Sequence, residues 1–289
     1  MIQAKKWSLR FGYILAILAF VQIAYGQAAN PIEVTLNNRG VILKGKFYAA
    51  KGDGPIPTIV LLQGFPGNNM DVLGIGQKIS EAGINTFTFN YSGTHQSEGE
   101  FGLDTTLTDI DTAWQYVHQQ DTVARFKIDS RRIILGGYSY GGGMGLTYAG
   151  EHPEVKRIIS IAGTDHGEFA REYMRNPAMA EIVNSMFDEY KAPKGPVRFE
   201  GRGVLKKLVE QADRYDLRKS APNLAGRDIL LIGGLDDVNI PIENHLLPLY
   251  RILKKEGAQN LQAIIYQDDH SFKNVRDQLA EQIAKWIKK

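Results

Sequence analysis

The pentapeptide Gly137-Tyr138-Ser139-Tyr140-Gly141 decides the fold prediction for this chain of 289 residues. A serine between two glycines at this spacing is typical of a sharp turn from a strand into a helix, with the serine hydroxyl held clear of the sheet. Such a turn brings the backbones of the two glycine positions close together, so only residues with little or no side chain fit there. The motif alone also occurs by chance, so its value as evidence depends on the segments before and after it.

The flanking segments match a strand before the turn and a helix after it. Residues 132–136 form a short apolar run of the kind that fills a buried parallel strand. Residues 142–150 carry Met144, Leu146 and Tyr148 at spacings that suit a helix. The combination makes Ser139 a candidate nucleophile on a strand–turn–helix unit.

From residue 32 onward, short apolar runs alternate with amphipathic segments, which is the pattern of an α/β protein with a mostly parallel sheet. We expect eight strands with helices on both faces, the first two strands forming an antiparallel hairpin turned at residues 37–40. The expected strands are Ile32–Leu36, Val41–Ala49, Thr58–Leu62, Asn85–Phe89, Arg132–Leu135, Arg157–Ile161, Ile229–Ile232 and Gln262–Tyr266. The expected helices are Met70–Ala82, Thr105–Gln120, Tyr140–His152, Ile242–Glu256 and Lys273–Lys288.

A long segment at about 164–224 breaks this alternation. A plain crossover between parallel strands needs only about a dozen residues, so the excess predicts a helical cap over the carboxyl edge of the sheet. We expect the cap and the loop 91–101 to shape the substrate pocket, and more than half of the large apolar cap residues to form the cap's own core. These residues are Phe169, Tyr173, Met174, Met179, Ile182, Met186, Phe187 and Tyr190.

The first 26 residues have the pattern of a secretory signal peptide. Basic residues at positions 5, 6 and 10 precede an apolar run from Phe11 to Ala24, and small residues stand at positions 24 and 26. The run is shorter than the roughly 20 residues of a spanning helix, so we expect it to be removed rather than kept as an uncleaved anchor. The domain then comprises residues 27–289, secreted or periplasmic, with no membrane span after cleavage.

Charge and cysteine content exclude several kinds of partner and site. The chain has 34 basic and 32 acidic residues, and because residues 1–26 contain three basic and no acidic ones, cleavage leaves 31 against 32. This balance gives no support for a nucleic acid or another strongly anionic partner. The absence of cysteine excludes disulfides and a cysteine-linked lipid, and a domain of this length buries a full core without them.

A serine nucleophile needs a base within hydrogen-bond reach, and the base is usually histidine. Of the six histidines, His270 lies directly after the last expected strand and before the last helix. Loops at the carboxyl ends of strands are where an open α/β sheet places its chemistry, so His270 is the best candidate. His95 and His166 also follow strands and remain weaker alternatives.

The acid that orients the histidine should follow another strand, between the serine and the histidine in chain order. Asp236 and Asp237 both lie in the turn that leaves the strand 229–232. Their side chains must point differently, so one of them reaches the imidazole and the other has a turn or capping role. The pattern of residues alone leaves both open.

Acyl transfer also needs two backbone N–H groups to hold the oxyanion. One is expected from Tyr140, directly after the serine at a helix amino terminus, where the helix dipole helps. The other is expected from Phe65, in the turn after the strand 58–62, because Gly64 allows the sharp turn and Pro66 has no N–H.

With these residues in place, the chain resembles a secreted α/β-hydrolase of the esterase and serine-peptidase-like type, over nearly all of residues 27–289. The resemblance rests on Gly64-Phe65-Pro66-Gly67, the pentapeptide 137–141, the turn from Gly234 to Pro241, and Asp269-His270-Ser271-Phe272. In that family the acid commonly stands three residues after a glycine and four before a proline, which favours Asp237 over Asp236. The chain departs from the family at Gln63, where a structural histidine is usual.

The resemblance implies a serine hydrolase that acts on carboxylic esters through Ser139, His270 and Asp237 and an acyl-enzyme intermediate. It implies a small-molecule ester or peptide as substrate and no metal or organic cofactor. The sequence contains no H-E-x-x-H and no P-loop.

Two alternatives have different consequences. A peptidase or amidase of the same fold would need a group that binds an amine, for which Glu168, Glu172 and Glu189 in the cap are candidates beside their simpler role as solvated residues. A non-catalytic binding protein that keeps the fold is the second alternative. Such proteins usually lose a catalytic residue, whereas all three positions are filled here.

Overall fold

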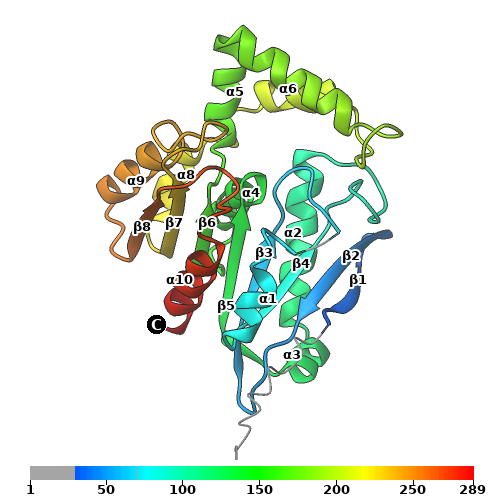
Figure 1. The fold of residues 1–289 in the computed structure, drawn as a ribbon, viewed down its shortest axis with the longest axis vertical. Coiled ribbons are helices and arrows are strands. Elements are labelled where there is room, and N and C mark those ends of the chain that lie inside the picture. The colour runs from blue at the N-terminus through cyan, green and yellow to red at the C-terminus, as the bar shows by residue number, and fades with distance from the viewer. Residues whose placement is uncertain (1–29, 70) are drawn as a thin grey trace, which may run out of the picture.

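The computed structural model describes residues 30–69 and 71–289 (Figure 1). The predicted signal peptide lies outside these residues, as does Met70, the predicted first residue of a helix. In the described ranges, no helix combines the length and the apolar character needed to cross a membrane.

Within the described residues, eight strands form a single sheet in the order β1-β2-β4-β3-β5-β6-β7-β8. β2 pairs antiparallel with β1 and with β4, and the remaining neighbours pair in parallel. The strands are β1 (Ile32–Asn38), β2 (Val41–Tyr48), β3 (Ile56–Leu62), β4 (Asn85–Phe89), β5 (Ile128–Tyr138), β6 (Arg157–Ile161), β7 (Asp228–Gly234) and β8 (Leu261–Tyr266). The expected mostly parallel eight-stranded sheet is confirmed.

The hairpin between β1 and β2 turns where the sequence predicts it. Arg39 and Gly40 both have positive φ, 53° and 94°, which is the backbone of a two-residue turn that matches the twist of the flanking strands. The Gly40 N–H donates to Asn37 Oδ1 at 2.7 Å and closes the turn.

The helices cover both faces of the sheet because successive strand residues point to opposite sides. Ile59 and Leu61 of β3 belong to the cluster that contains α1 and α10, whereas Val60 and Leu62 belong to the cluster that contains α2 and α4. The helices in the described ranges are α1 (Gly76–Glu81), α2 (Leu103–His118), α3 (Gln120–Phe126), α4 (Tyr140–Glu151), α5 (His166–Arg175), α6 (Pro177–Tyr190), α7 (Arg202–Glu210), α8 (Leu217–Leu224), α9 (Leu246–Lys255) and α10 (Arg276–Lys288).

Helices α5, α6 and α7 lie between β6 and β7 in the chain, and Figure 1 shows α5 and α6 above the carboxyl ends of the parallel strands. We call these three helices the cap. The loop after β4 joins it to the domain: the Phe101 N–H donates to the Arg198 carbonyl at 2.8 Å, and the Arg198 N–H donates to the Gly93 carbonyl at 2.7 Å. The fourth helix of this segment, α8, packs against α4 and α9 and so continues the layer that covers the sheet.

Several element boundaries differ from the prediction for local reasons. Helix α1 begins at Gly76 because Leu73 and Gly74 have positive φ, which ends any helical run that starts at residue 70. The Asp71 carboxylate accepts the Gly76 N–H at 2.8 Å and so supports the later start. Helix α3 was not predicted; the extended backbone of Gln119 separates it from α2.

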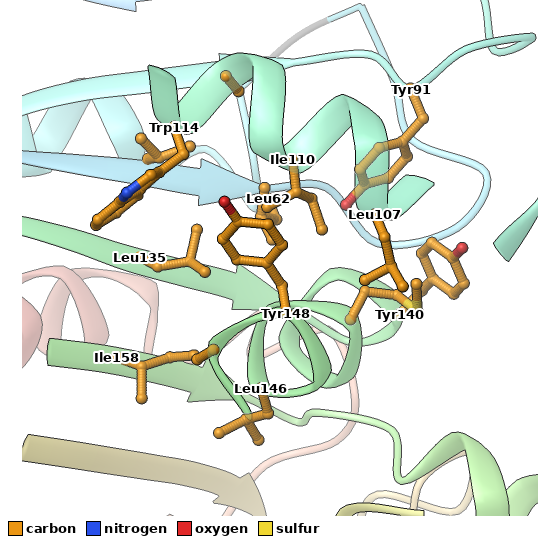
Figure 2. Packing of buried hydrophobic residues seen from close by; sticks show 14 of the residues in the cluster. Leu62, Tyr91, Leu107, Ile110, Trp114, Leu135, Tyr140, Leu146, Tyr148 and Ile158 are labelled. Atoms are coloured by element: carbon orange, nitrogen blue, oxygen red, sulfur yellow. The ribbon is translucent and has the colours of Figure 1, made fainter. Parts of the chain in front are cut away.

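A substitution at Ile110 of α2 measures how much the packing of this helix on the sheet contributes to stability. The Ile110 side chain is fully buried beside Leu62, Leu107 and Trp114 (Figure 2). We expect Ile110→Ala to lower the free energy of unfolding by about 2–4 kcal/mol, because it removes buried methylene groups and leaves a cavity. Urea denaturation followed by circular dichroism measures this change. The exposed Gln115→Ala on the same helix is the control, expected to alter stability by about 0.5 kcal/mol or less.

Candidate active site

Ser139 occupies the junction between β5 and α4 in a strained backbone conformation. Its φ of 53° and ψ of −119° lie in a region that costs a residue with a side chain about 1–3 kcal/mol. Neighbouring backbone overcomes this cost: the Ser139 N–H donates to the Ile161 carbonyl at 2.8 Å, and the Ser139 carbonyl accepts the N–H groups of Gly143 and Thr164. The strain is thus held by β6 and by the first turn of α4.

The two flanking glycines are required by close backbone contacts. A Cβ atom on Gly137 would lie 2.3 Å from the Gly141 carbonyl oxygen, and one on Gly141 would lie 2.4 Å from the Gln63 carbonyl oxygen. Both distances are far below van der Waals contact. The structure therefore contains the tight turn that the sequence predicts, and also shows that the turn packs against the end of β3.

Three side chains from loops at the carboxyl ends of β5, β7 and β8 meet at this turn. His270 Nε2 lies 2.9 Å from Ser139 Oγ, and His270 Nδ1 lies 2.7 Å from Asp237 Oδ2. A carboxylate can only accept a hydrogen bond, so the imidazole proton lies on Nδ1 and Nε2 presents its lone pair to the serine hydroxyl. The three residues form one continuous hydrogen-bonded line.

Of the two adjacent aspartates, the structure places Asp237 beside the histidine. Its side chain is fully buried, and its Oδ1 accepts the N–H groups of Asn239 and Ile240 at 2.9 and 2.8 Å, which leaves Oδ2 for His270. Asp236 is exposed and accepts from Gln267 Nε2 at 2.7 Å. The two backbone donors that orient Asp237 were not predicted, although an aspartate followed by a polar turn residue is a typical start of such a turn.

The alternative histidines do not take this position. Among the described residues, neither His95 nor His166 forms a hydrogen bond with Ser139. The His166 ring is buried against Tyr140, with ring centroids 5.0 Å apart, and burial lowers its pKa to about 3, so it is neutral at physiological pH.

The two predicted oxyanion donors lie on segments that adjoin Ser139. Tyr140 is the first residue of α4. The loop of Phe65 passes close by, since a Cβ atom on Gly64 would lie 3.3 Å from Ser139 Cβ. This arrangement brings a helix amino terminus and a strand-end loop close to the serine.

A cavity of about 960 Å³ opens above Ser139 and His270, between the sheet and the cap. Its walls are largely apolar, and they come from all three cap helices, from Phe65 and Phe101 of the core loops, and from the turn after β7. We predicted that the loop 91–101 shapes the substrate pocket. Of its residues, Phe101 lines the cavity. A polar edge is formed by Glu172, Arg175, Asn176, Asn239 and Asn244.

The prediction that most apolar cap residues form a separate core is wrong. Cap residues that line the cavity are Phe169, Met179, Ile182, Met186, Phe187 and Tyr190. The three cap helices contact one another, but their apolar side chains belong to or pack against the domain's main core and line the cavity, so the cap has no core apart from the domain. Met174 is exposed.

The three acidic cap candidates have different environments. Glu168 forms ion pairs with Arg171 and Arg175. Glu189 is exposed and pairs with Lys194, whereas Glu172 lies in the cavity wall. Sequence could not separate them, because their environments depend on side chains from distant segments. Within residues 30–69 and 71–289, the structure shows no group of three or more His, Cys, Asp or Glu side chains placed to hold a metal ion.

Comparison with known proteins identifies the family. A family model described as alpha/beta hydrolase fold matches residues 57–203, which is just over half of the chain. The chain belongs to the alpha/beta hydrolase fold family. An uncharacterized 31.7 kDa protein from the traX-finO intergenic region of Escherichia coli is 33% identical over 233 residues, covering 70% of this chain and 80% of that protein.

Solved structures show the same fold in enzymes. An esterase of Pyrococcus furiosus matches with a TM-score of 0.66 and 13% identity, over 89% of this chain and 90% of the esterase. An acylaminoacyl peptidase of Pyrococcus horikoshii matches with a TM-score of 0.62 and 17% identity, over 89% of this chain and 41% of the peptidase. These likenesses establish the fold.

In this hydrolase, Gln63 stabilises the loop 63–68 beside Ser139, at the position where a histidine is common. The buried Gln63 donates from its side-chain Nε2 to the Asn68 backbone carbonyl at 3.5 Å, and the Gln63 backbone carbonyl accepts from the Tyr91 hydroxyl at 2.8 Å. The Gln63 side chain therefore links the two ends of this loop, and the Tyr91 hydroxyl holds the backbone at its start.

A substitution at Gly137 tests the close contact between positions 137 and 141 on which this turn depends. We expect Gly137→Ala to lower the free energy of unfolding by about 2–3 kcal/mol, because the added methyl group overlaps the Gly141 backbone. Gly226→Ala is the matched control: a Cβ atom there meets nothing within 4 Å, and we expect a change of about 1 kcal/mol or less. Equal stability of the two variants in urea denaturation would contradict this account of the turn.

Proposed function

We propose that this hydrolase is a serine esterase that cleaves carboxylic esters through Ser139, His270 and Asp237. The observation that carries the proposal is the hydrogen-bonded line of Asp237 Oδ2, His270 and Ser139 Oγ, with separations of 2.7 and 2.9 Å, at the floor of a largely apolar cavity. A serine paired in this way with an imidazole that a carboxylate orients has the arrangement of an activated nucleophile.

In the first half of the reaction, Ser139 Oγ attacks the ester carbonyl carbon while His270 Nε2 takes the hydroxyl proton. The imidazolium that forms is stabilised by the buried carboxylate of Asp237, whose orientation is held by two backbone N–H groups. The negative charge on the carbonyl oxygen is held by the N–H groups of Phe65 and Tyr140. His270 then protonates the departing alcohol, which leaves an acyl group on Ser139.

In the second half, water takes the place of the alcohol. His270 accepts a proton from the water as its oxygen attacks the acyl carbon, and the same two N–H groups hold the second oxyanion. Collapse of this intermediate breaks the bond to Ser139 Oγ, and His270 returns the proton to the serine. The acid product then leaves and the cycle restarts.

The cavity favours substrates with an apolar acyl group. Met179, Met186 and Phe187 of α6 and Leu205 of α7 supply an apolar wall, and burial of each methylene group against such a surface contributes about 0.8 kcal/mol. We therefore expect turnover of medium-length acyl esters. A peptidase or amidase of the same fold is the second candidate, supported by the structural likeness to the acylaminoacyl peptidase.

The catalytic assignment is tested with p-nitrophenyl esters of graded acyl length. We expect Ser139→Ala to lower kcat/KM by about 10⁴-fold or more, since it removes the attacking oxygen. Asp237→Asn is expected to lose about 10³- to 10⁴-fold, because the amide disturbs the imidazole tautomer. Asp236→Asn is the matched control and is expected to retain activity within about twofold, as an exposed side chain away from the imidazole.

Two outcomes would redirect the proposal. Labelling of Ser139 by a fluorophosphonate without turnover of any ester would favour the peptidase. No labelling and no turnover would favour a non-catalytic binding protein. Equal losses for Asp236→Asn and Asp237→Asn would show that the aspartate assignment is wrong.

The acyl-binding role of the cap is tested separately at Met186, which is half-buried in the cavity wall. We expect Met186→Trp to fill part of the cavity and shift the preferred acyl length toward shorter esters, lowering kcat/KM for octanoate by about 10-fold relative to acetate. Ser185→Trp, at the exposed neighbouring position, is the control and should leave the profile unchanged. A uniform loss over all chain lengths would mean that the acyl group lies elsewhere.

A further inference from the structure

Helix α5 presents one carboxylate to the polar edge of the cavity. The side chain of Glu172 is 14% exposed, in the cavity wall. Its Oε1 accepts from Asn244 Nδ2 at 2.6 Å, and its Oε2 lies 3.3 Å from His245 Nε2. A carboxylate can accept about four hydrogen bonds, so these two contacts orient Glu172 and leave acceptor capacity toward the cavity.

His245 turns its protonated nitrogen toward Glu172. The imidazole is buried, and the Asp165 N–H donates to its Nδ1 at 3.2 Å. An atom that accepts this N–H must carry a lone pair, so the ring proton lies on Nε2, the nitrogen that faces Glu172. Asn244 is uncharged as well. Both partners thus fix the position of the carboxylate without cancelling its charge.

The neighbouring charges balance one another without Glu172. Asp165, Glu168 and Asp216 lie among the three arginines Arg171, Arg175 and Arg218. The ion pairs in this group join Arg171 to Glu168 and Asp216, Arg175 to Glu168, and Arg218 to Asp165, Glu168 and Asp216. Among the described residues, no lysine or arginine forms an ion pair with Glu172.

Glu172 is therefore a carboxylate in the cavity wall that, among the described residues, pairs with no lysine or arginine, since Arg175 of the same wall pairs with Glu168. The contact with His245 is the main cause that lowers the pKa of Glu172 below its usual value, against the opposing effect of partial burial. Glu172 also lies in the last turn of α5, where helix carbonyl groups add negative potential. A partly desolvated anion of this kind is stabilised by a cation that enters the cavity.

We propose that Glu172 binds a protonated primary amine on the substrate, so that the enzyme selects esters that carry an ammonium group. This inference rests on the proposed esterase function, because it assigns a substrate class to the same cavity. The ammonium group would lie at the polar edge, between Glu172 and Asn244. The uncharged part of the substrate would lie against the apolar wall formed by Met186 and Phe187 of α6.

Binding to the Ser139→Ala variant tests the proposal without requiring turnover. One pair of probes is para-aminomethylphenyl butyrate and para-ethylphenyl butyrate, which differ by an ammonium group in place of a methyl group on the alcohol side. A second pair, phenyl para-aminomethylbenzoate and phenyl para-ethylbenzoate, places the same difference on the acyl side. In calorimetric titrations we expect the ammonium member of one pair to bind about 10- to 100-fold more tightly, the effect of one charge-assisted hydrogen bond.

The same titrations on two further variants assign this preference to a residue. Glu172→Gln keeps the size and shape of the side chain and removes its charge, so we expect the preference for the ammonium probe to disappear while the neutral probes still bind. Glu189→Gln removes a cap carboxylate that is exposed and paired with Lys194, and we expect it to keep the preference. A urea denaturation curve for each variant checks that the cap remains folded.

The proposal is overturned if neither ammonium probe is preferred, or if the preference survives Glu172→Gln. It is also overturned if para-hydroxymethylphenyl butyrate binds as tightly as the ammonium probe, since a neutral donor would then suffice. These outcomes are distinct from failure of the esterase function, which is read from ester hydrolysis by the wild-type chain. If the wild-type chain hydrolyses no ester but still prefers the ammonium probe through Glu172, the binding proposal holds and only the esterase proposal fails.

Discussion

The crossing of three backbone segments at Ser139 is the constraint on which the rest of the site depends. A serine at a φ of 53° is unfavourable by itself, and it persists here because β6, the end of β3 and the first turn of α4 all hold its neighbours. Positions 137 and 141 must be glycine for this reason, since a Cβ atom at either one would overlap a neighbouring backbone segment. Once the turn is built, the hydroxyl, the helix amino terminus and the loop at Phe65 share one small region.

Parallel strand order explains why residues far apart in the chain meet there. β5, β7 and β8 all end at the same edge of the sheet, so the loops that carry Ser139, Asp237 and His270 come together although about 130 residues separate the first from the last. The fine placement depends on local turns: the backbone N–H groups of Asn239 and Ile240 rotate Asp237 toward the imidazole, whereas its neighbour Asp236 faces solvent. A difference of one position along the chain thus separates a buried, oriented carboxylate from an exposed one.

The cap adds selectivity to a reaction centre that is otherwise general. Its helices supply apolar side chains to the cavity wall, and α5 also carries residues of a charged cluster. Three arginines and three acids in that cluster neutralise one another, and Glu172 instead contacts Asn244 and His245. The polarity of the cavity is consequently uneven, because a polar edge that contains both Glu172 and Arg175 adjoins a largely apolar wall.

The sequence by itself determined the class of fold, the strand–turn–helix unit at Ser139 and the order of the three reactive residues. These follow from short-range rules, because strand periodicity, helix spacing and the glycine requirement of a tight turn are written within a few neighbouring residues. Even the mostly parallel sheet follows from the alternation of such local patterns. The start of α1 at Gly76, by contrast, depended on two positive φ angles that no periodicity marks.

Only the tertiary structure decided which residues line the cavity and which charges cancel. Phe169, Met179 and Phe187 have the composition of a small core, yet they line the cavity and pack with the domain's main core. Glu168, Glu172 and Glu189 are alike in sequence, yet one lies among arginines, one in the cavity wall and one in solvent. Burial and electrostatic pairing depend on side chains brought together from distant segments, and that information exists only after the chain has folded.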